Sequence, residues 1–469
     1  MKFQSIFYVA LIVLGFQNFI PSPTFADSKV QSMGDAFVKS LPATWSAVPG
    51  TWNYFDAVNC YLYQSTCYGN NPSSPYGYPS FADESGSQLF GNFHFEKSTA
   101  VVMFLRTPPE VRYFGFTQYL ATRGNGEEPF ASLGDTLNHL EIATLSSSSS
   151  GSGVFNQYAV IVWTADEQTL SDIKIRLSQQ GVPDSAVNFI PLPVKFPLHL
   201  GSDSNADTFV MLMRAALPTN PSSFEQYTTE KPFYILKVTP DSATTRIPTE
   251  TIPYAQEGSG VAEDPSLASA LDALVSDIKS KYRRGYSFND LVVGSPSWNG
   301  WLCIRTGLSC AGDNHDALYT FDMLQPLTVS NLQDFVVVAG VNHQKTGKAL
   351  YINHSVYDTV KSAGIVSVDD RKLTTESAIY HAGVTLTNDP RRAQYAQLYA
   401  YLISYDCHGL EYCLQIPAPT PSNPIGLEPG APFRIGGRYY VDPKTQGRVK
   451  VRPVASEVVI HKVFIGTAR

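Results

Sequence analysis

Short apolar segments rich in β-branched and aromatic residues recur along this chain, and they constrain its fold more than any other feature. They include TAVVMFLR (99–106) and TFVMLMRAAL (208–217) in the first half, and DFVVVAGVNH (334–343), KALYINHS (348–355) and AQLYAYLISY (396–405) in the second. Runs of this length and composition, bounded by turn-forming residues, are typical of β-strands. They predict a β-rich α+β fold with two β-sandwich-like or mixed-sheet domains and few helices.

Two segments have helical periodicity instead. Residues 164–181 lie between the strand-like runs YAVIVW (158–163) and NFIPLPV (188–194), with Thr164 as the expected helix cap and Gly181 at the end. This order predicts a strand–helix–strand unit. A second amphipathic helix is expected to begin near Leu267, where apolar residues repeat three and four positions apart.

A segment rich in Pro, Thr, Ser and Gly separates the two halves of the chain. Such a composition is typical of a linker. The expected organisation is therefore a signal peptide at 1–26, an N-terminal α+β domain at 27–245, a linker at 246–265 and a C-terminal β-rich domain at 266–469.

The N-terminus has the pattern of an export signal. Lys2 precedes the uncharged, mostly apolar run FQSIFYVALIVLGFQNFI (3–20), and small residues precede Ala26. A positive start, an apolar core and a small-residue site together indicate a secretory signal peptide cleaved near Ala26. We expect an exported protein, secreted or periplasmic, without a permanent membrane anchor; retention of the signal segment is the alternative.

The cysteines agree with export. They form three local pairs: Cys60 and Cys67, Cys303 and Cys310, and Cys407 and Cys413. The alternative, a soft-metal site, would need four converging ligands, and no C-x2-C spacing is present. Three nearest-neighbour disulfides are therefore expected, each closing a loop too short to remove much entropy from the unfolded chain.

Charge and motifs exclude several classes of function. Charged residues make up only 16% of the chain and the net charge is −7, so a nucleic-acid partner is not expected. No P-loop, G-x-G-x-x-G or H-E-x-x-H motif is present, and no nucleotide cofactor is expected. The cofactor, if there is one, is unknown; a divalent metal is possible.

Two histidines flank the short polar break in GVNHQKTGKALYINHS (340–355). QKTG (344–347) is a natural hairpin turn between the two apolar runs. In that hairpin His343 pairs with Lys348, and His354 lies roughly 20 Å away along the ladder. The pattern therefore predicts that His343 and His354 cannot belong to one site.

The best candidate for catalysis is His315, which lies between Asp313 and Asp316 just after a cysteine pair. A histidine beside carboxylates can act as a general base or bind a metal. The alternative is a turn in which the aspartates cap backbone amides. His354 and His408 are candidates for a second acid, because His354 lies at a strand end and His408 lies in the loop between Cys407 and Cys413. The segment 312–318 (GDNHDAL) also has a weak sequence similarity to 134–140 (GDTLNHL) in the other half.

Aromatic residues favour a second interpretation. Tyr68, Tyr76 and Tyr78, with Trp298 and Trp301, could stack on a sugar or a flat organic ligand. Tyr351, next to His354, is a further candidate for ligand binding. Packing of aromatic residues within β-sheets is the alternative.

Two functions remain open from the sequence. The first is an exported enzyme, a hydrolase or lyase that uses histidine acid/base chemistry on a small-molecule or glycan-like substrate. The second is a non-catalytic binding or surface-interaction protein that uses its Tyr- and Trp-rich loops.

Overall fold

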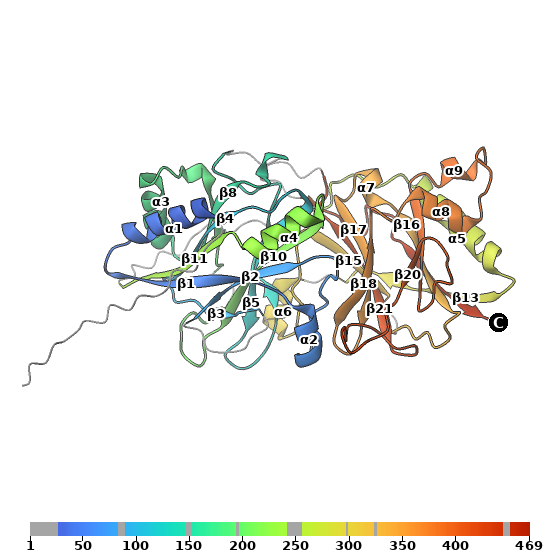
Figure 1. Ribbon diagram of the computed structural model, residues 1–469, viewed down its shortest axis with the longest axis horizontal. Coiled ribbons are helices and arrows are strands. Elements are labelled where there is room, and N and C mark those ends of the chain that lie inside the picture. The colour runs from blue at the N-terminus through green and yellow to red at the C-terminus, as the bar shows by residue number, and fades with distance from the viewer. Residues whose placement is uncertain are drawn as a thin grey trace, which may run out of the picture.

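The computed structural model describes residues 27–82, 90–146, 152–193, 197–241, 256–296, 299–322, 326–443 and 451–469. The signal segment 1–26, residues 246–255 of the expected linker and Trp298 lie outside the described residues. The molecule is elongated, with the N-terminal half on the left and the C-terminal half on the right of Figure 1.

The N-terminal half is built on one curled 11-stranded sheet. Most of its strands run in the order β6-β5-β10-β2-β1-β11-β4-β8-β9, with β3 beside β10 and β7 beside β5. Their bounds are β1 (Trp45–Tyr54), β2 (Tyr76–Phe81), β3 (Phe93–His94), β4 (Ala100–Arg106), β5 (Val111–Thr122), β6 (Ala131–Ser132), β7 (Leu137–Asn138), β8 (Tyr158–Thr164), β9 (Val187–Pro191), β10 (Thr208–Pro218) and β11 (Phe233–Pro240).

The C-terminal half contains two five-stranded sheets that pack face to face. The inner sheet, next to the N-terminal half, has the order β14 (Val293–Gly294), β15 (Ala317–Asp322), β21 (Phe433–Tyr440), β17 (Tyr351–Asp358) and β18 (Ala363–Asp369). The outer sheet has the order β13 (Tyr286–Leu291), β23 (Lys462–Ala468), β16 (Phe335–Val341), β19 (Leu398–Ser404) and β20 (Cys413–Gln415). A small parallel pair joins β12 (Gln256–Glu257) to β22 (Val451–Arg452).

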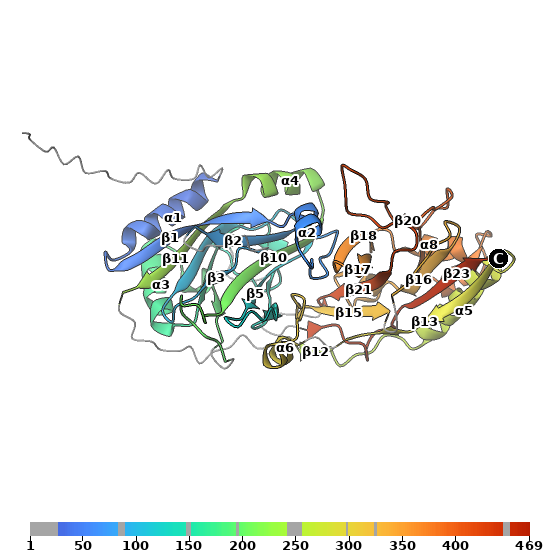
Figure 2. The same ribbon diagram turned by 90° about the horizontal axis from the view of Figure 1, so that it is seen from below.

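The helices lie at the two ends of the molecule and near the boundary between its halves (Figures 1 and 2). Their bounds are α1 (Ser28–Ser40), α2 (Ala57–Tyr63), α3 (Glu167–Gln179), α4 (Pro221–Glu230), α5 (Ser266–Tyr282), α6 (Gly300–Thr306), α7 (His343–Thr346), α8 (Thr375–Ala382) and α9 (Arg391–Gln394). Helices α1 and α3 cover β4 and β8 at one end, and α5 and α8 cover the outer sheet at the other. None of the described helices is both long and apolar enough to cross a membrane.

Separate apolar clusters fill the spaces between these layers. Phe116, Trp163 and Met211 belong to the core enclosed by the curled sheet. Val338 and Ile435 lie in the core between the two five-stranded sheets. A third cluster, which includes Tyr113 of β5 and Tyr319, Tyr351 and Tyr440 of the inner sheet, joins the two halves. The inner sheet is therefore buried on both faces.

The structure confirms the β-rich α+β class with several sheets, and it confirms all three nearest-neighbour disulfides. The strand–helix–strand unit is present as parallel strands β8 and β9 connected through α3. Its expected cap is wrong, because Thr164 stays in β8 and Asp166 accepts the hydrogen bond from the Thr169 amide.

The hairpin expected over 340–355 is also wrong. β16 pairs with β19 and β23, whereas β17 pairs with β18 and β21 in the other sheet. Residues 343–346 form the helical turn α7, with the Asn342 side chain capping it through the amides of Gln344 and Lys345. This cap chemistry outweighed the turn signal of QKTG, so the connection crosses between two sheets.

Candidate functional site

The loop around His315 joins the two halves of the molecule. The Asp313 carboxylate accepts hydrogen bonds from the amide and the hydroxyl of Ser132, at 2.8 and 2.7 Å. His315 Nε2 lies 3.4 Å from Asp313 Oδ2. Burial opposes ionisation of Asp313, but the contacts with His315 and Ser132 outweigh it and hold the pKa of that carboxyl below its usual value.

The Asp316 carboxylate likewise accepts hydrogen bonds from residues of the N-terminal half. It accepts hydrogen bonds from the Tyr113 hydroxyl at 2.8 Å and from the Asn138 amide at 3.0 Å. Thr136 donates a hydrogen bond to Asn314 at 3.0 Å. The two segments that resemble each other in sequence, 134–140 and 312–318, therefore contact each other across the boundary between the halves. Both aspartates hold that boundary together.

His354 lies on the other face of the inner sheet, in the core between the two five-stranded sheets. Its Nε2 is 2.5 Å from the Tyr399 hydroxyl, and its ring lies 4.5 Å from that of His461. His343 and His354 both pack against the Tyr439 ring, at 4.7 and 6.4 Å between ring centroids. The expectation that these two histidines lie far apart is therefore wrong.

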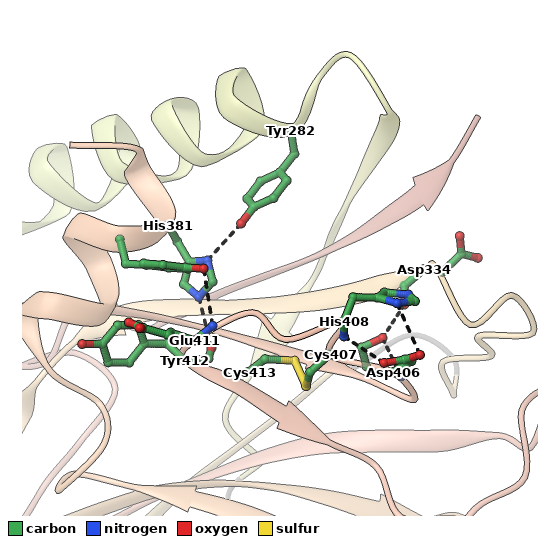
Figure 3. The surroundings of a disulfide bond; sticks show 11 residues. Tyr282, Asp334, His381, Asp406, Cys407, His408, Glu411, Tyr412 and Cys413 are labelled. Carbon is green, nitrogen blue, oxygen red and sulfur yellow. Dashed lines mark hydrogen bonds and ion pairs between the residues drawn. A yellow bond between two sulfur atoms is a disulfide. The ribbon is translucent and has the colours of Figure 1, made fainter. Parts of the chain in front are cut away.

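His408 lies in the exposed loop closed by the Cys407–Cys413 disulfide, as Figure 3 shows. Its Nδ1 is 3.3 Å from Asp406 Oδ2, and both side chains are about half exposed. Neither His354 nor His408 contacts His315. The structure thus places the three histidines proposed for acid/base chemistry in three different surroundings.

The residues proposed for ligand binding are also separated. Tyr351 is buried between the halves, where its hydroxyl accepts a hydrogen bond from Asn71 at 3.1 Å. Trp301 is partly exposed on α6. Tyr68 and Tyr76, in contrast, line a common cavity.

This cavity lies between the two halves and measures about 50 Å³. Its walls are mainly aromatic, and it also contains two arginines, Arg214 and Arg438, together with Asp313. The aromatic lining residues are Tyr68, Tyr76, Phe90, Phe130, Tyr319, Phe321 and Tyr440. Because the strands alternate their faces, Arg214 of β10 and Arg438 of β21 both point into the space between the halves.

Arg214 is only 4% exposed. It donates hydrogen bonds to the Tyr119 hydroxyl at 2.5 Å and to the carbonyl of Gly312 at 2.7 Å. The Tyr76 ring, directly across the β2–β10 ladder, lies 5.3 Å from its guanidinium carbon. All of these partners are formally neutral.

Arg438 is 5% exposed and is less well satisfied. It donates one hydrogen bond, to the carbonyl of Gly69. Its Nε and Nη1 atoms are buried and have no hydrogen-bond acceptor among the described residues. Tyr319, opposite Arg438 in the β15–β21 ladder, and Tyr357 lie 5.7 and 5.4 Å from its guanidinium carbon. No described carboxylate is within ion-pair distance of either arginine.

Two disulfide-closed loops complete the cavity, and we call them the stapled loops: 60–69, closed by Cys60–Cys67, and 303–312, closed by Cys303–Cys310. Each ends in Cys-x-Gly, and in each the last two residues have positive φ: Tyr68 and Gly69, Ala311 and Gly312. A Cβ on Gly312 would lie 2.6 Å from the Phe130 ring, so the position requires glycine.

Each stapled loop docks on the opposite half of the molecule. The Gly69 amide donates to the carbonyl of Ser362 at 2.7 Å, and the Gly312 amide donates to the carbonyl of Phe130 at 2.8 Å. Each glycine carbonyl then accepts a hydrogen bond from the arginine of the opposite half. Left-handed backbone at non-glycine residues is costly and is often found at functional sites, and Tyr68, Phe130 and Ala311 all have it here.

The sequence contains two signals for this site. Each arginine lies inside a strand-like run, in TFVMLMRAAL (208–217) and GGRYYVD (436–442). A charged residue in such a run is rarely buried without a partner. The Cys-x-Gly ending is shared by two of the three cysteine pairs, whereas Cys413 is followed by Leu414 and Gln415.

The described residues contain no group of three or more His, Cys, Asp or Glu side chains arranged to hold a metal ion. The two guanidinium groups that line the cavity are always positively charged and do not bind a cation.

Comparison with known proteins gives only distant structural likenesses. No protein-family model matches the sequence, and no curated protein matches it. An uncharacterized protein from Burkholderia cenocepacia has a TM-score of 0.38 and 11% identity, over 94% of this chain and 87% of that one. The VPA0106 protein from Vibrio parahaemolyticus has a TM-score of 0.37 and 9% identity, over 93% of this chain and 100% of that one. At this level of likeness nothing about function passes to this chain.

Proposed function

We propose that this chain is a binding protein for a small anion, held in the cavity between its two halves by Arg438 and Arg214. The observation that carries the proposal is the buried guanidinium of Arg438, two of whose nitrogens have no acceptor among the described residues. An arginine stays protonated in proteins, and burial of an unpaired charge costs several kcal/mol.

The surrounding groups do not compensate this charge. Burial raises the pKa of Tyr319 and Tyr440, so both phenols stay neutral. Asp313 is the one carboxylate lining the cavity among the described residues, and it is held by Ser132 beside His315. Two positive charges against one negative charge leave the site favourable for an anion.

The size and the walls of the cavity favour a small carboxylate. A water molecule needs roughly 10–15 Å³ of such volume, so about 50 Å³ accepts a few waters or an ion of acetate size but not a sugar ring. Phosphate would need hydrogen-bond donors on all sides. A short carboxylate instead presents its oxygens to the arginines and its apolar end to the aromatic walls.

We also propose that the protein acts outside the cytosol. Its three disulfides support this, because such bonds persist in oxidising compartments. Catalysis by His315 with His354 or His408 stays a prediction of the sequence; the separation of these histidines favours binding over acid/base chemistry.

Thermal unfolding of the full-length protein tests the proposal. Acetate, formate, nitrate, phosphate and sulfate are each titrated against wild type, Arg438→Gln and Arg434→Gln. Arg434 lies on the same strand but has a carboxylate neighbour, Asp322, 3.8 Å away, and serves as the matched control. Acetate at a hundred times its Kd would stabilise wild type and Arg434→Gln by about 2.7 kcal/mol and leave Arg438→Gln unchanged. The proposal fails if no anion stabilises wild type, or if the response survives in Arg438→Gln.

A further inference from the structure

A second hollow lies directly beside the arginine cavity. It measures about 240 Å³ and is more polar, with Gln64, Asn92 and Glu128 among its lining residues. It shares three side chains with the arginine cavity: Tyr68, Phe90 and Phe130 line both. These three rings therefore form the wall between the outer hollow and the buried arginines.

The rings of this wall are packed on one another. Phe90 and Phe130 are stacked at 5.1 Å between centroids, and Tyr68 lies 4.7 Å from Phe130. A polar contact holds the wall on the side of the outer hollow: the Tyr68 hydroxyl donates to Glu128 Oε2 at 2.8 Å. Phe55 and Tyr78 also pack on Phe90, and Tyr119 packs on Phe130. The three shared residues contribute their rings to the wall, so a change of ring rotamer is the movement that would open it.

The backbone beneath two of the rings is in a costly conformation. Tyr68 has φ 52° and Phe130 has φ 33°, both in the left-handed region that bulky residues rarely adopt. Favourable contacts with the surrounding residues offset the free-energy cost of this conformation. Both residues line the hollow as well as the cavity.

We infer that Tyr68, Phe90 and Phe130 form an aromatic gate, latched by Tyr68–Glu128, through which small carboxylates pass from the outer hollow to Arg214 and Arg438. The inference rests on the proposed anion site and deepens it, because the gate selects by size. A short aliphatic carboxylate passes between the rings when the latch opens, whereas a branched or bulky acid is held in the outer hollow.

Chemical modification of the two arginines tests the gate without a bound anion. Methylglyoxal, a three-carbon dicarbonyl close in size to a short carboxylate, modifies guanidinium groups, and mass spectrometry of digested protein gives the rate at each arginine. Tyr68→Phe keeps the ring and removes the latch. Loss of one hydrogen bond should speed modification of Arg214 and Arg438 about fivefold. Phe90→Ala removes a stacked ring and should speed it about tenfold.

Two controls make the test specific. Tyr63→Phe alters an exposed tyrosine on the same stapled loop and should leave both rates unchanged. Arg106, which pairs with Asp27 and Glu230, reports on general loosening of the fold within each sample. Unchanged rates at Arg214 and Arg438 in both gate variants would overturn the gate, as would an equal acceleration at Arg106.

The gate and the anion site can fail independently. If the anion titrations succeed while modification is insensitive to Tyr68 and Phe90, the site stands and the gate is wrong. If modification is gated as stated but no anion binds, access is controlled as inferred and the proposed function fails.

Discussion

The inner sheet carries a buried polar cluster on each face, and the two clusters differ in how their charge is balanced. Successive side chains of a strand point to opposite faces. On β21, Arg438 therefore lies in the cavity between the halves, whereas Tyr439 lies in the core between the two five-stranded sheets. Both residues are almost fully buried.

The cluster between the sheets is balanced by its own groups. The Tyr439 hydroxyl lies 2.6 Å from His461 Nδ1, and the Glu263 carboxylate contacts His343 Nδ1 at 2.8 Å. Burial lowers the pKa of His461 to about 3 and that of His354 well below its usual value, so both imidazoles are neutral. Each of these histidines keeps one ring nitrogen without a partner among the described residues, but a neutral nitrogen costs far less than a charge.

The cluster around Arg438 lacks such a balance, because a guanidinium cannot become neutral by losing its proton. The comparison teaches that equal burial has two outcomes. Where the polar groups can become neutral or pair internally, they belong to the folded core. Where a permanent charge is left unpaired beside a cavity, we propose that a bound ligand balances it. The predictions below test this distinction, from the largest expected effect to the smallest.

Acid should destabilise the protein through its buried histidines. Their unfolded pKa is 6.5, and burial lowers the folded pKa of His139 and His381 to about 4 and that of His461 to about 3, with His354 lowered as well. Below pH 6.5 the unfolded chain therefore binds more protons than the folded chain. The free energy of unfolding decreases as the pH is lowered.

Buried carboxyls oppose part of this effect. Burial raises the pKa of Asp322 and Asp370 to about 6, and that of Asp207 in the same direction, so the folded state takes up protons there. The four histidines outweigh the two or three carboxyls. The free energy of unfolding should therefore decrease by roughly 2 kcal/mol per pH unit between pH 6 and pH 4. Chemical denaturation across this range measures it. A stability that stays flat or rises on acidification would mean that the core histidines are charged.

Removing Glu263 should damage the cluster between the sheets and leave the anion site intact. Its carboxylate accepts hydrogen bonds from the Val459 amide at 2.7 Å and from Thr346, besides its contact with His343. Glu263→Ala should lower the free energy of unfolding by about 3–5 kcal/mol, with acetate affinity unchanged. Glu376→Ala, at an exposed helix position, is the matched control with an effect near zero. Loss of acetate binding in Glu263→Ala would show that the two clusters are not separate.

The two disulfides of the C-terminal half should differ in their effect on acetate affinity. Cys303→Ala/Cys310→Ala frees the stapled loop that presents the Gly312 carbonyl, and acetate affinity should weaken about tenfold because the loop must be ordered on binding. Cys407→Ala/Cys413→Ala opens a loop of similar length that does not line the cavity, and the affinity should not change. Calorimetric titration of both double variants measures the difference. Equal losses would contradict the role of the stapled loops.

In buffer without small anions, Arg438→Met should keep the stability of wild type within about 1 kcal/mol or increase it, because it removes a buried unpaired charge. Arg434→Met removes a charge next to Asp322 and should be destabilising. Denaturant titration gives both values. A loss of 3 kcal/mol or more in Arg438→Met would show that the guanidinium is already satisfied without a ligand.

Much of the fold could be predicted from the sequence, because strand composition and local cysteine spacing are short-range signals. The hairpin at 340–355 could not, since the choice of sheet for β16 and β17 depends on distant strands and on the Asn342 cap. The proposed anion site cannot be predicted for a related reason. Asp313 and His315 are neighbours in sequence, whereas Arg214 and Arg438 meet only across the boundary between the two halves.

The most direct test of the central claim is isothermal titration of acetate into wild type and Arg438→Gln. The unpaired guanidinium predicts one acetate per chain in wild type and no measurable heat of binding in the variant, with both proteins folded by circular dichroism. Binding of equal stoichiometry and affinity in both, or in neither, would contradict the assignment of the cavity as an anion site.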